Sequence, residues 1–198
     1  MSFNLFGYLL YASLMSITPG PNNLMLFSYG KAYGFNDSRN VMLGIFLGFF
    51  LMLCLAGYGI AKIITSNPMA GVVLKIVGSL WMLYLAFMLR KLTVEIEPSN
   101  KKAAIGFGQA FSMQFVNLKA WVMAISGASA FLPQSKNIHL NVFVYAISFG
   151  LVGIPCMIIW LKMGDVIAKI IKSEKAGQIL GYTMFSLMIV SIITIWVQ

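Results

Sequence analysis

Two short polar interruptions lie within otherwise apolar stretches of this chain, about one hundred residues apart. The first reads TPGPNN (residues 18–23), and the second reads QFVNLK (residues 114–119). Irregular backbone and charge are costly at membrane depth, and they persist where they face the protein interior or a cavity. Interrupted segments in matching positions of two halves are the best sequence indication of a transporter's binding site. These two hexapeptides therefore form the candidate site.

The first interruption contains two prolines on either side of a glycine. Pro19 and Pro21 lack a backbone N–H, and Gly20 tolerates backbone conformations that other residues avoid. We expect one helix to end here and a second, short helix to begin near Asn22. The free N–H groups and positive dipole end of that helix suit a carboxylate, and Asn22 and Asn23 add amide donors and acceptors. The alternative is a packed proline kink without a ligand.

The second interruption carries Lys119, the one charged residue deep within any predicted span. A lysine there costs about 2.5–3.5 kcal/mol on insertion scales and usually pairs with an acid. The five acidic residues all fall in connections or at span ends: Asp37, Glu95, Glu97, Asp165 and Glu174. Lys119 could rest on carbonyls freed by a break near Asn117, be neutral, await an anionic group of a substrate, or snorkel to an interface. Gln114 and Asn117 add polar groups beside it, of a kind that also bridges helices by hydrogen bonds.

The composition identifies the elements that must position these residues as membrane-spanning helices. Of 198 residues, 60% are hydrophobic and 10% are charged, whereas soluble domains contain about 25% charged residues. We expect an all-α integral membrane protein with a single domain over residues 1–198. Cys54 and Cys156 form no C-x-x-C pair, and the chain lacks a P-loop and a Cys/His cluster. No metal, cofactor or enzymatic activity is expected.

Six apolar stretches are long enough to span a bilayer as helices. They cover about 3–29, 41–61, 71–89, 105–132, 140–161 and 176–197. The halves, about 1–95 and 105–198, resemble each other weakly: 15–19 aligns with 113–117 and Cys54 with Cys156. Three spans per half predict two inverted three-helix repeats with broken first and fourth helices. Chance similarity between apolar helical regions is the alternative.

Basic residues predict the orientation in the membrane. Ten of them fall in the first, third and fifth connections: Lys31, Arg39, Arg90, Lys91, Lys101, Lys102, Lys162, Lys169, Lys172 and Lys175. The second and fourth connections hold Lys62, Lys75 and Lys136. The odd connections should therefore be cytoplasmic, with both termini outside. This placement also accounts for the net charge of +9 without a nucleic-acid partner.

Three motifs resemble the lysine exporter / homoserine-resistance (LysE/RhtB) family of bacterial amino-acid exporters. They are SITPGPNN at 16–23, LKIVG at 74–78 with WMLYLA at 81–86, and QFVNLKAW at 114–121 followed by LPQ at 132–134. The chain departs from the family at Leu118, where proline is usual, and in lacking an acidic residue after Gly48. The residues around both interruptions are most similar to the cysteine/O-acetylserine exporter branch.

The resemblance implies secondary export of a small neutral amino acid or derivative, cysteine/O-acetylserine-like or homoserine/threonine-like. The protein would lie in the bacterial inner membrane as a multi-pass protein. Asn22, Asn23 and Asn117 would bind the amino-acid backbone, and Lys119 the carboxylate or a titrating proton. The competing class is a membrane scaffold or assembly subunit that transports nothing. Whether the chain forms a homo-oligomer is left open by the sequence.

Overall fold

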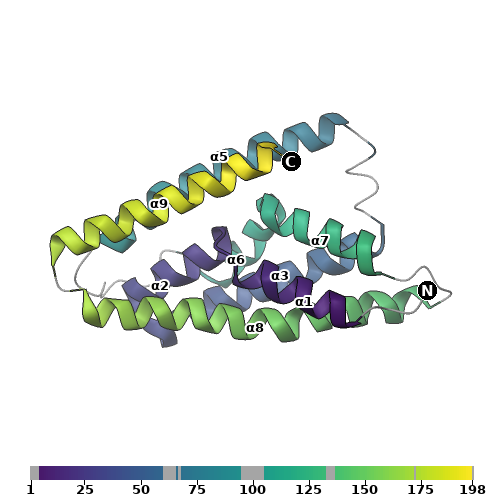
Figure 1. Cartoon of the computed structure of the whole chain (residues 1–198), viewed down its shortest axis with the longest axis horizontal. Coiled ribbons are helices and arrows are strands. Elements are labelled where there is room, and N and C mark those ends of the chain that lie inside the picture. Colours follow the sequence, from purple (N-terminus) through teal and green to yellow (C-terminus); the bar gives the residue numbers. More distant parts are fainter. Residues whose placement is uncertain are drawn as a thin grey trace.

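The computed structural model describes residues 5–59, 66, 68–94, 105–132, 137–171 and 173–197, and the regular elements within these ranges are all helices (Figure 1). In chain order they are α1 (Leu5–Ile17), α2 (Pro21–Asp37), α3 (Arg39–Gly57), α5 (Pro68–Val94), α6 (Phe107–Met113), the 3₁₀ helix η1 (Gln114–Val116), α7 (Leu118–Phe131), α8 (Ile138–Ile170) and α9 (Glu174–Val197).

Four of the described helices are long and apolar enough to cross a membrane. The qualifying segments are Arg39–Gly57, Gly71–Met88, Ile138–Ile170 and Glu174–Thr194, and α1 and α7 are shorter apolar helices. The first and fourth apolar stretches of the sequence are missing from these four because each is divided into shorter helices. The all-helical membrane architecture expected from composition is thus present.

The division of the first stretch follows from its prolines. α1 ends at Ile17, and α2 begins at Pro21 with Gly20 as its N-cap residue. Proline is favourable at the first helical position because the N–H that it lacks would have no helical partner there. Pro21 therefore favours the start of α2, whereas Pro19 contributes to the end of α1.

The second stretch is divided without a proline. α6 ends at Met113, η1 forms a tight turn over Gln114–Val116, and Asn117 takes an extended conformation (φ −83°, ψ 102°). The Asn117 side chain then caps α7 by accepting a hydrogen bond from the Ala120 N–H over 3.4 Å. Asparagine is among the best N-cap residues, so it restarts the helix without a proline.

Each interrupted helix pair packs against an uninterrupted helix of the other half of the chain. α1 and α2 lie along α8, whereas α6 and α7 lie along α3. The crossings are close: a Cβ atom added at Gly30 would meet the Leu161 carbonyl, and one added at Gly164 would meet the Phe27 carbonyl. Gly44 and Gly48 of α3, in a G-x-x-x-G spacing, likewise face the α6 backbone, so this spacing serves helix packing.

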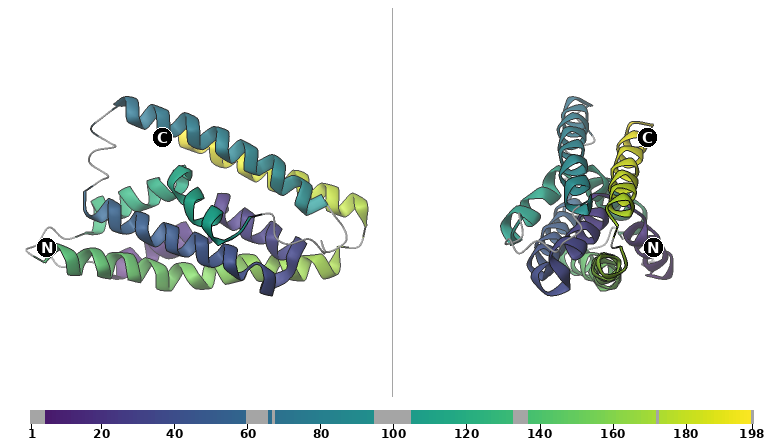
Figure 2. Two further views of the ribbon diagram at one scale, coloured as in Figure 1. Left: turned by 180° about the vertical axis from the view of Figure 1, so that it is seen from behind. Right: turned by 90° about the vertical axis from the view of Figure 1, so that its left-hand side faces the viewer.

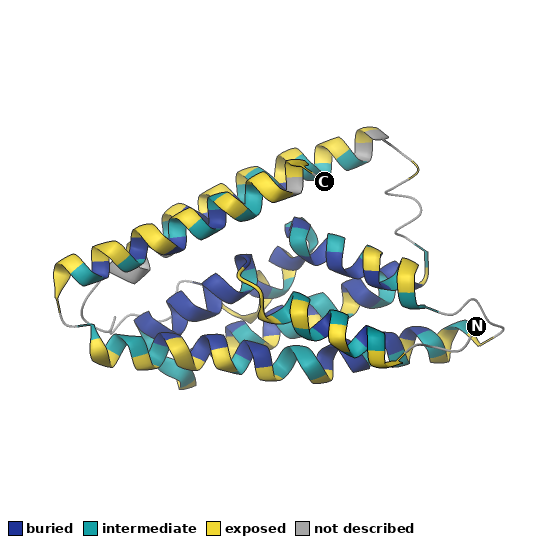
Figure 3. Cartoon of the chain, viewed as in Figure 1, coloured by how far each residue is buried: buried dark blue, intermediate teal, exposed yellow. Residues whose placement is uncertain are grey.

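The α5 and α9 helices pack along each other to one side of the remaining helices, as two views show (Figure 2). Figure 3 shows that most of their surface is exposed. The exposed residues are largely apolar, among them Val73, Leu80, Ile179 and Val190. Such surface is compatible with lipid, because acyl chains are as apolar as leucine.

One expectation about charge is wrong. The sequence assigned Lys31 to the first connection, but α2 continues past Lys31 to a kink at Gly34 (φ 77°), and Lys31 is buried with 5% exposure. Lys119 is therefore not the one charged residue deep in the helical body. Other residues used for orientation or charge pairing fall outside the described ranges: Lys62, Glu95, Glu97, Lys101, Lys102, Lys136 and Lys172. The orientation stays a prediction.

Candidate functional site

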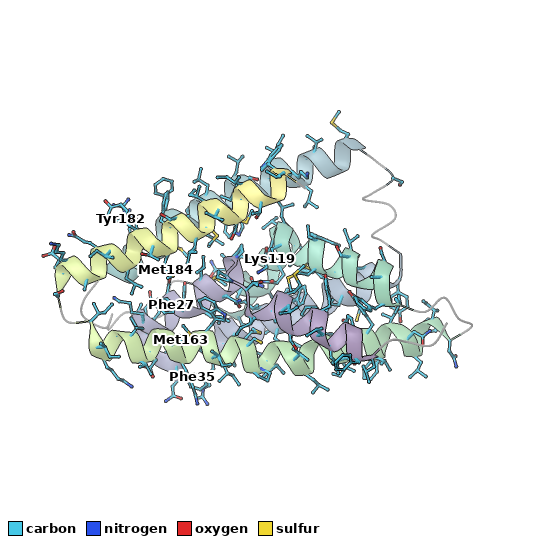
Figure 4. All side chains as sticks on the ribbon, in the orientation of Figure 1. Phe27, Phe35, Lys119, Met163, Tyr182 and Met184 are labelled. Atoms are coloured by element: carbon cyan, nitrogen blue, oxygen red, sulfur yellow. The ribbon has the colours of Figure 1, made fainter. Side chains whose placement is uncertain are left out.

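A cavity of about 620 Å³, counting the part that is open to solvent, lies where the two interruptions meet. Most of the candidate residues line it: Gly20, Pro21, Asn22, Asn23, Asn117 and Lys119. Figure 4 places Lys119 centrally in the molecule, beside the ends of α2 and α7 that face each other. Pro19 and Gln114 are not part of the lining, and Gln114 is fully buried behind it.

Three side-chain amides join the two interruptions. Asn22 and Gln114 exchange hydrogen bonds, with Asn22 Nδ2 donating to Gln114 Oε1 over 2.8 Å and Gln114 Nε2 donating to Asn22 Oδ1 over 3.1 Å. Asn117 Nδ2 also donates to Asn22 Oδ1 over 2.9 Å. Gln114 Nε2 donates in addition to the Ala110 carbonyl. Gln114 thus fixes the orientation of Asn22 from behind the cavity wall.

Lys119 binds backbone of the first interruption. Its Nζ donates to the Thr18 carbonyl oxygen over 2.9 Å, to Thr18 Oγ1 over 2.9 Å and to the Pro19 carbonyl oxygen over 3.0 Å. Of the alternatives left open by the sequence, the structure shows the one in which freed carbonyls receive the ammonium. These carbonyls belong to the first interruption, however, and not to the break beside Asn117 that the sequence analysis named.

The remaining carbonyls at the end of α1 also have donors. Asn23 Nδ2 donates to the Ser16 carbonyl over 2.7 Å and to the Thr18 carbonyl over 2.8 Å. Trp160 Nε1 donates to the Ile17 carbonyl over 3.1 Å. An interruption inside a membrane protein is tolerated when such groups are satisfied internally. Both amide hydrogens of Asn23 are used in this way, so its N–H groups hold the interruption in shape.

The glycine of the first interruption is explained by Lys119. Gly20 has extended backbone (φ −176°, ψ 176°) that any residue can adopt, so the expectation based on its conformational freedom is wrong. A Cβ atom at this position would lie 2.6 Å from Lys119 Cδ and 2.9 Å from Lys119 Nζ. Glycine leaves room for the lysine side chain, which passes directly over it and would have to shift if the residue were larger.

Sequence reasoning missed two parts of the site. One is Ser16, whose buried Oγ has no hydrogen-bond partner and which lines the cavity. Its position in the last turn before the prolines was the available signal. The other is the apolar lining from α3 and α8, which includes Phe49 and Phe149. Trp160 and Trp121 each donate to a carbonyl at an interruption, Trp160 to that of Ile17 and Trp121 to that of Phe115.

The arrangement has the chemistry of a small-molecule binding site. The first turn of α2 lines the cavity, and the first N–H groups of a helix lack helical partners and attract anions. An ammonium, three amides and a free hydroxyl stand beside these groups. No group of three or more Cys, His, Asp or Glu residues suited to a metal occurs in the described part of the chain.

Comparisons with known proteins agree with the sequence motifs. A family model described as LysE type translocator matches residues 13–195. The cysteine/O-acetylserine efflux protein of Salmonella choleraesuis (strain SC-B67) is 32% identical over 158 residues, which are 79% of this chain and 80% of the relative. The protein of the same name from Escherichia coli (strain K12) is 26% identical over 163 residues, or 82% and 83% of the two chains. No solved structure matches.

Proposed function

The chain belongs to the LysE type translocator family, and from this membership and its central cavity we propose that it exports small neutral amino acids or their derivatives by secondary transport. It is an amino-acid efflux protein of the bacterial inner membrane, with several helices able to cross the bilayer. The substrates in the names of its relatives, cysteine and O-acetylserine, are the first candidates here.

One observation carries the proposal. Lys119 and the Asn22–Gln114–Asn117 amides connect two interruptions about one hundred residues apart at the wall of a single cavity. An α-amino acid offers a carboxylate and an ammonium, which need donors and acceptors respectively. The positive charge of Lys119 and the free N–H groups in the first turn of α2 suit the carboxylate, and the oxygens of Asn117 and Ser16 supply acceptors for the ammonium.

The transport unit comprises residues 1–198. It has six spans in total, arranged as two inverted repeats of three spans each. α1 with α2 forms the first span and α6, η1 and α7 form the fourth. Reciprocal packing supports this arrangement, since each divided span lies along the second span of the other repeat. Rocking of one repeat against the other would expose the cavity to each side in turn.

Uptake of labelled amino acids into inside-out membrane vesicles tests the function. Vesicles containing the protein should accumulate neutral amino acids above vesicles that contain the Pro19→Ala, Gly20→Ala, Pro21→Ala triple variant. That variant restores a continuous helix, because a proline costs about 3 kcal/mol in a helix interior and alanine costs nothing. A scaffold would give no uptake of any amino acid at verified membrane abundance, and that result would contradict the proposal.

A further inference from the structure

The cavity has two walls of different chemistry. Its polar side chains come from the two interruptions and from the residue Ser16 beside the first one: Ser16, Asn22, Asn23, Asn117 and Lys119. The facing wall comes from α3 and α8 and presents only carbon and sulfur side-chain atoms. Within the described residues, Lys119 is the one charged side chain in the lining.

The apolar wall is built from one face of each of two helices. The α3 face consists of Ile45, Phe46, Phe49, Phe50 and Leu53. Spacings of one, four, five and eight residues place these side chains on one side of the helix. The α8 face consists of Ala146, Phe149, Gly150, Gly153 and Met157, with spacings of three, four, seven and eleven.

Aromatic and sulfur-containing side chains join the two faces. The Phe49 and Phe149 rings meet edge to face, with centroids 5.0 Å apart and planes at 75°. The Phe46 ring lies against Gly150, where an added Cβ atom would be 2.9 Å from the ring. Met15, Met123 and Met157 complete the lining, and thioethers adapt to irregular apolar shapes.

Resting on the proposed export of amino acids, we propose that the α3–α8 wall receives the substrate side chain and makes the transporter selective for hydrocarbon and sulfur-containing side chains over hydroxylated ones. The amino-acid backbone is held by the interruptions, so the side chain projects toward Phe49 and Phe149 of this wall and toward Met123 of α7 beside it. These three residues determine specificity.

The selectivity follows from desolvation. A hydroxyl group that leaves water for this wall finds no donor or acceptor, and an unpaired buried hydroxyl is unfavourable. A thiol or methyl group of similar size loses little hydration and gains contacts with the rings. A basic side chain is the least favourable of the three in the cavity, because its charge would find no acidic partner. The described acidic residues are all absent from the lining: Asp37, Asp165 and Glu174.

Competition between isosteric substrates tests this inference without any variant. Valine and threonine differ by a methyl in place of a hydroxyl, and cysteine and serine by a thiol in place of a hydroxyl. Inside-out vesicles should take up valine over threonine, and cysteine over serine, by about tenfold to a hundredfold at low concentration, the range that an apolar pocket achieves. Equal uptake, or preference for threonine and serine, would overturn the selectivity while leaving amino-acid export intact. Absence of uptake for the whole amino-acid panel would overturn the export proposal itself.

A matched pair of variants tests whether Phe49 belongs to the wall that contacts the substrate side chain. Phe49→Tyr adds one hydroxyl to the cavity lining and should lower the valine-to-threonine ratio by threefold or more, on the order of one hydrogen bond. Phe143→Tyr adds the same hydroxyl on the exposed surface of α8 and should leave the ratio unchanged. An unchanged ratio in Phe49→Tyr, with normal valine uptake, would remove Phe49 from the specificity wall.

Discussion

The Lys119 ammonium donates a hydrogen bond to the Thr18 carbonyl oxygen over 2.9 Å and across 101 residues of sequence. Thr18 follows the last residue of α1, where carbonyl groups concentrate partial negative charge. This relationship explains how a lysine is accommodated inside an apolar protein although no acidic residue of the described ranges pairs with it. It also ties the end of α1 to the start of α7, so any anion that draws Lys119 away loosens a link between the two halves.

Replacement of Lys119 should abolish export without preventing insertion. Lys119→Met removes an insertion penalty of about 2.5–3.5 kcal/mol, so membrane abundance should be normal or higher, whereas vesicle uptake should fall by most of its value. Lys119→Arg should rescue only in part, because a planar guanidinium replaces a compact ammonium. Lys169→Met, at an exposed position on α8, is the control and should transport normally. Wild-type transport by Lys119→Met would exclude this lysine from the site.

Gly20→Ala should impair transport through Lys119. The new methyl group would lie 2.6 Å from Lys119 Cδ, so the lysine must move, and a displacement of about 1 Å in a functional site can cost a hundredfold in rate. Gly108→Ala, where an added Cβ atom meets nothing within 4 Å, should be neutral.

A double-mutant cycle separates this effect from general misfolding. If Gly20→Ala acts by displacing Lys119, combining it with Lys119→Met should reduce uptake no further than Lys119→Met alone. Additive losses in the double variant would show that Gly20 acts independently of the lysine.

Asn23→Ala should lower stability. The substitution leaves the Ser16 carbonyl without its 2.7 Å donor and removes one donor from the Thr18 carbonyl. An unsatisfied buried acceptor costs about 1–3 kcal/mol, which should lower the thermal unfolding midpoint of the purified protein in detergent. Asn36→Ala, at an exposed position near the end of α2, should leave the midpoint in place. Equal midpoints for the two variants would show that Asn23 does not hold the interruption.

Orientation can be checked by labelling single cysteines in a variant that lacks Cys54 and Cys156. Because basic residues favour the cytoplasmic side, Asn137→Cys should react with an impermeant thiol reagent added outside intact cells. Ser173→Cys, at the connection between α8 and α9, should react only after the membrane is opened. The reverse pattern would overturn the predicted orientation.

Much of the candidate site could be predicted because it depends on local chemistry. Pro19 and Pro21 remove backbone donors wherever they stand, so a helix ends and another begins between Ile17 and Pro21. Lys119 and the amides were identified because polar groups are rare in such apolar segments. The divided fourth stretch followed from its likeness to the first, although it contains no proline and Asn117 caps α7 instead.

The partners of these residues were decided only by the tertiary structure. Nothing within ten residues of Lys119 indicates that it binds the Thr18 and Pro19 carbonyls, that its side chain passes over Gly20, or that Gln114 holds Asn22 from behind. Hydrogen bonds between segments about one hundred residues apart depend on how the helices cross.

The sequence by itself determined a helical membrane protein of the exporter family with two interruptions, because composition, proline chemistry and motif are local properties. The tertiary structure decided which apolar faces line the cavity. Along α3 and α8 most residues are apolar on all sides of the helix, since lipid is as apolar as a protein core, so hydrophobic pattern cannot distinguish Phe49 in the cavity from Phe143 on the surface. Only the packing of the helices around the two interruptions makes that distinction.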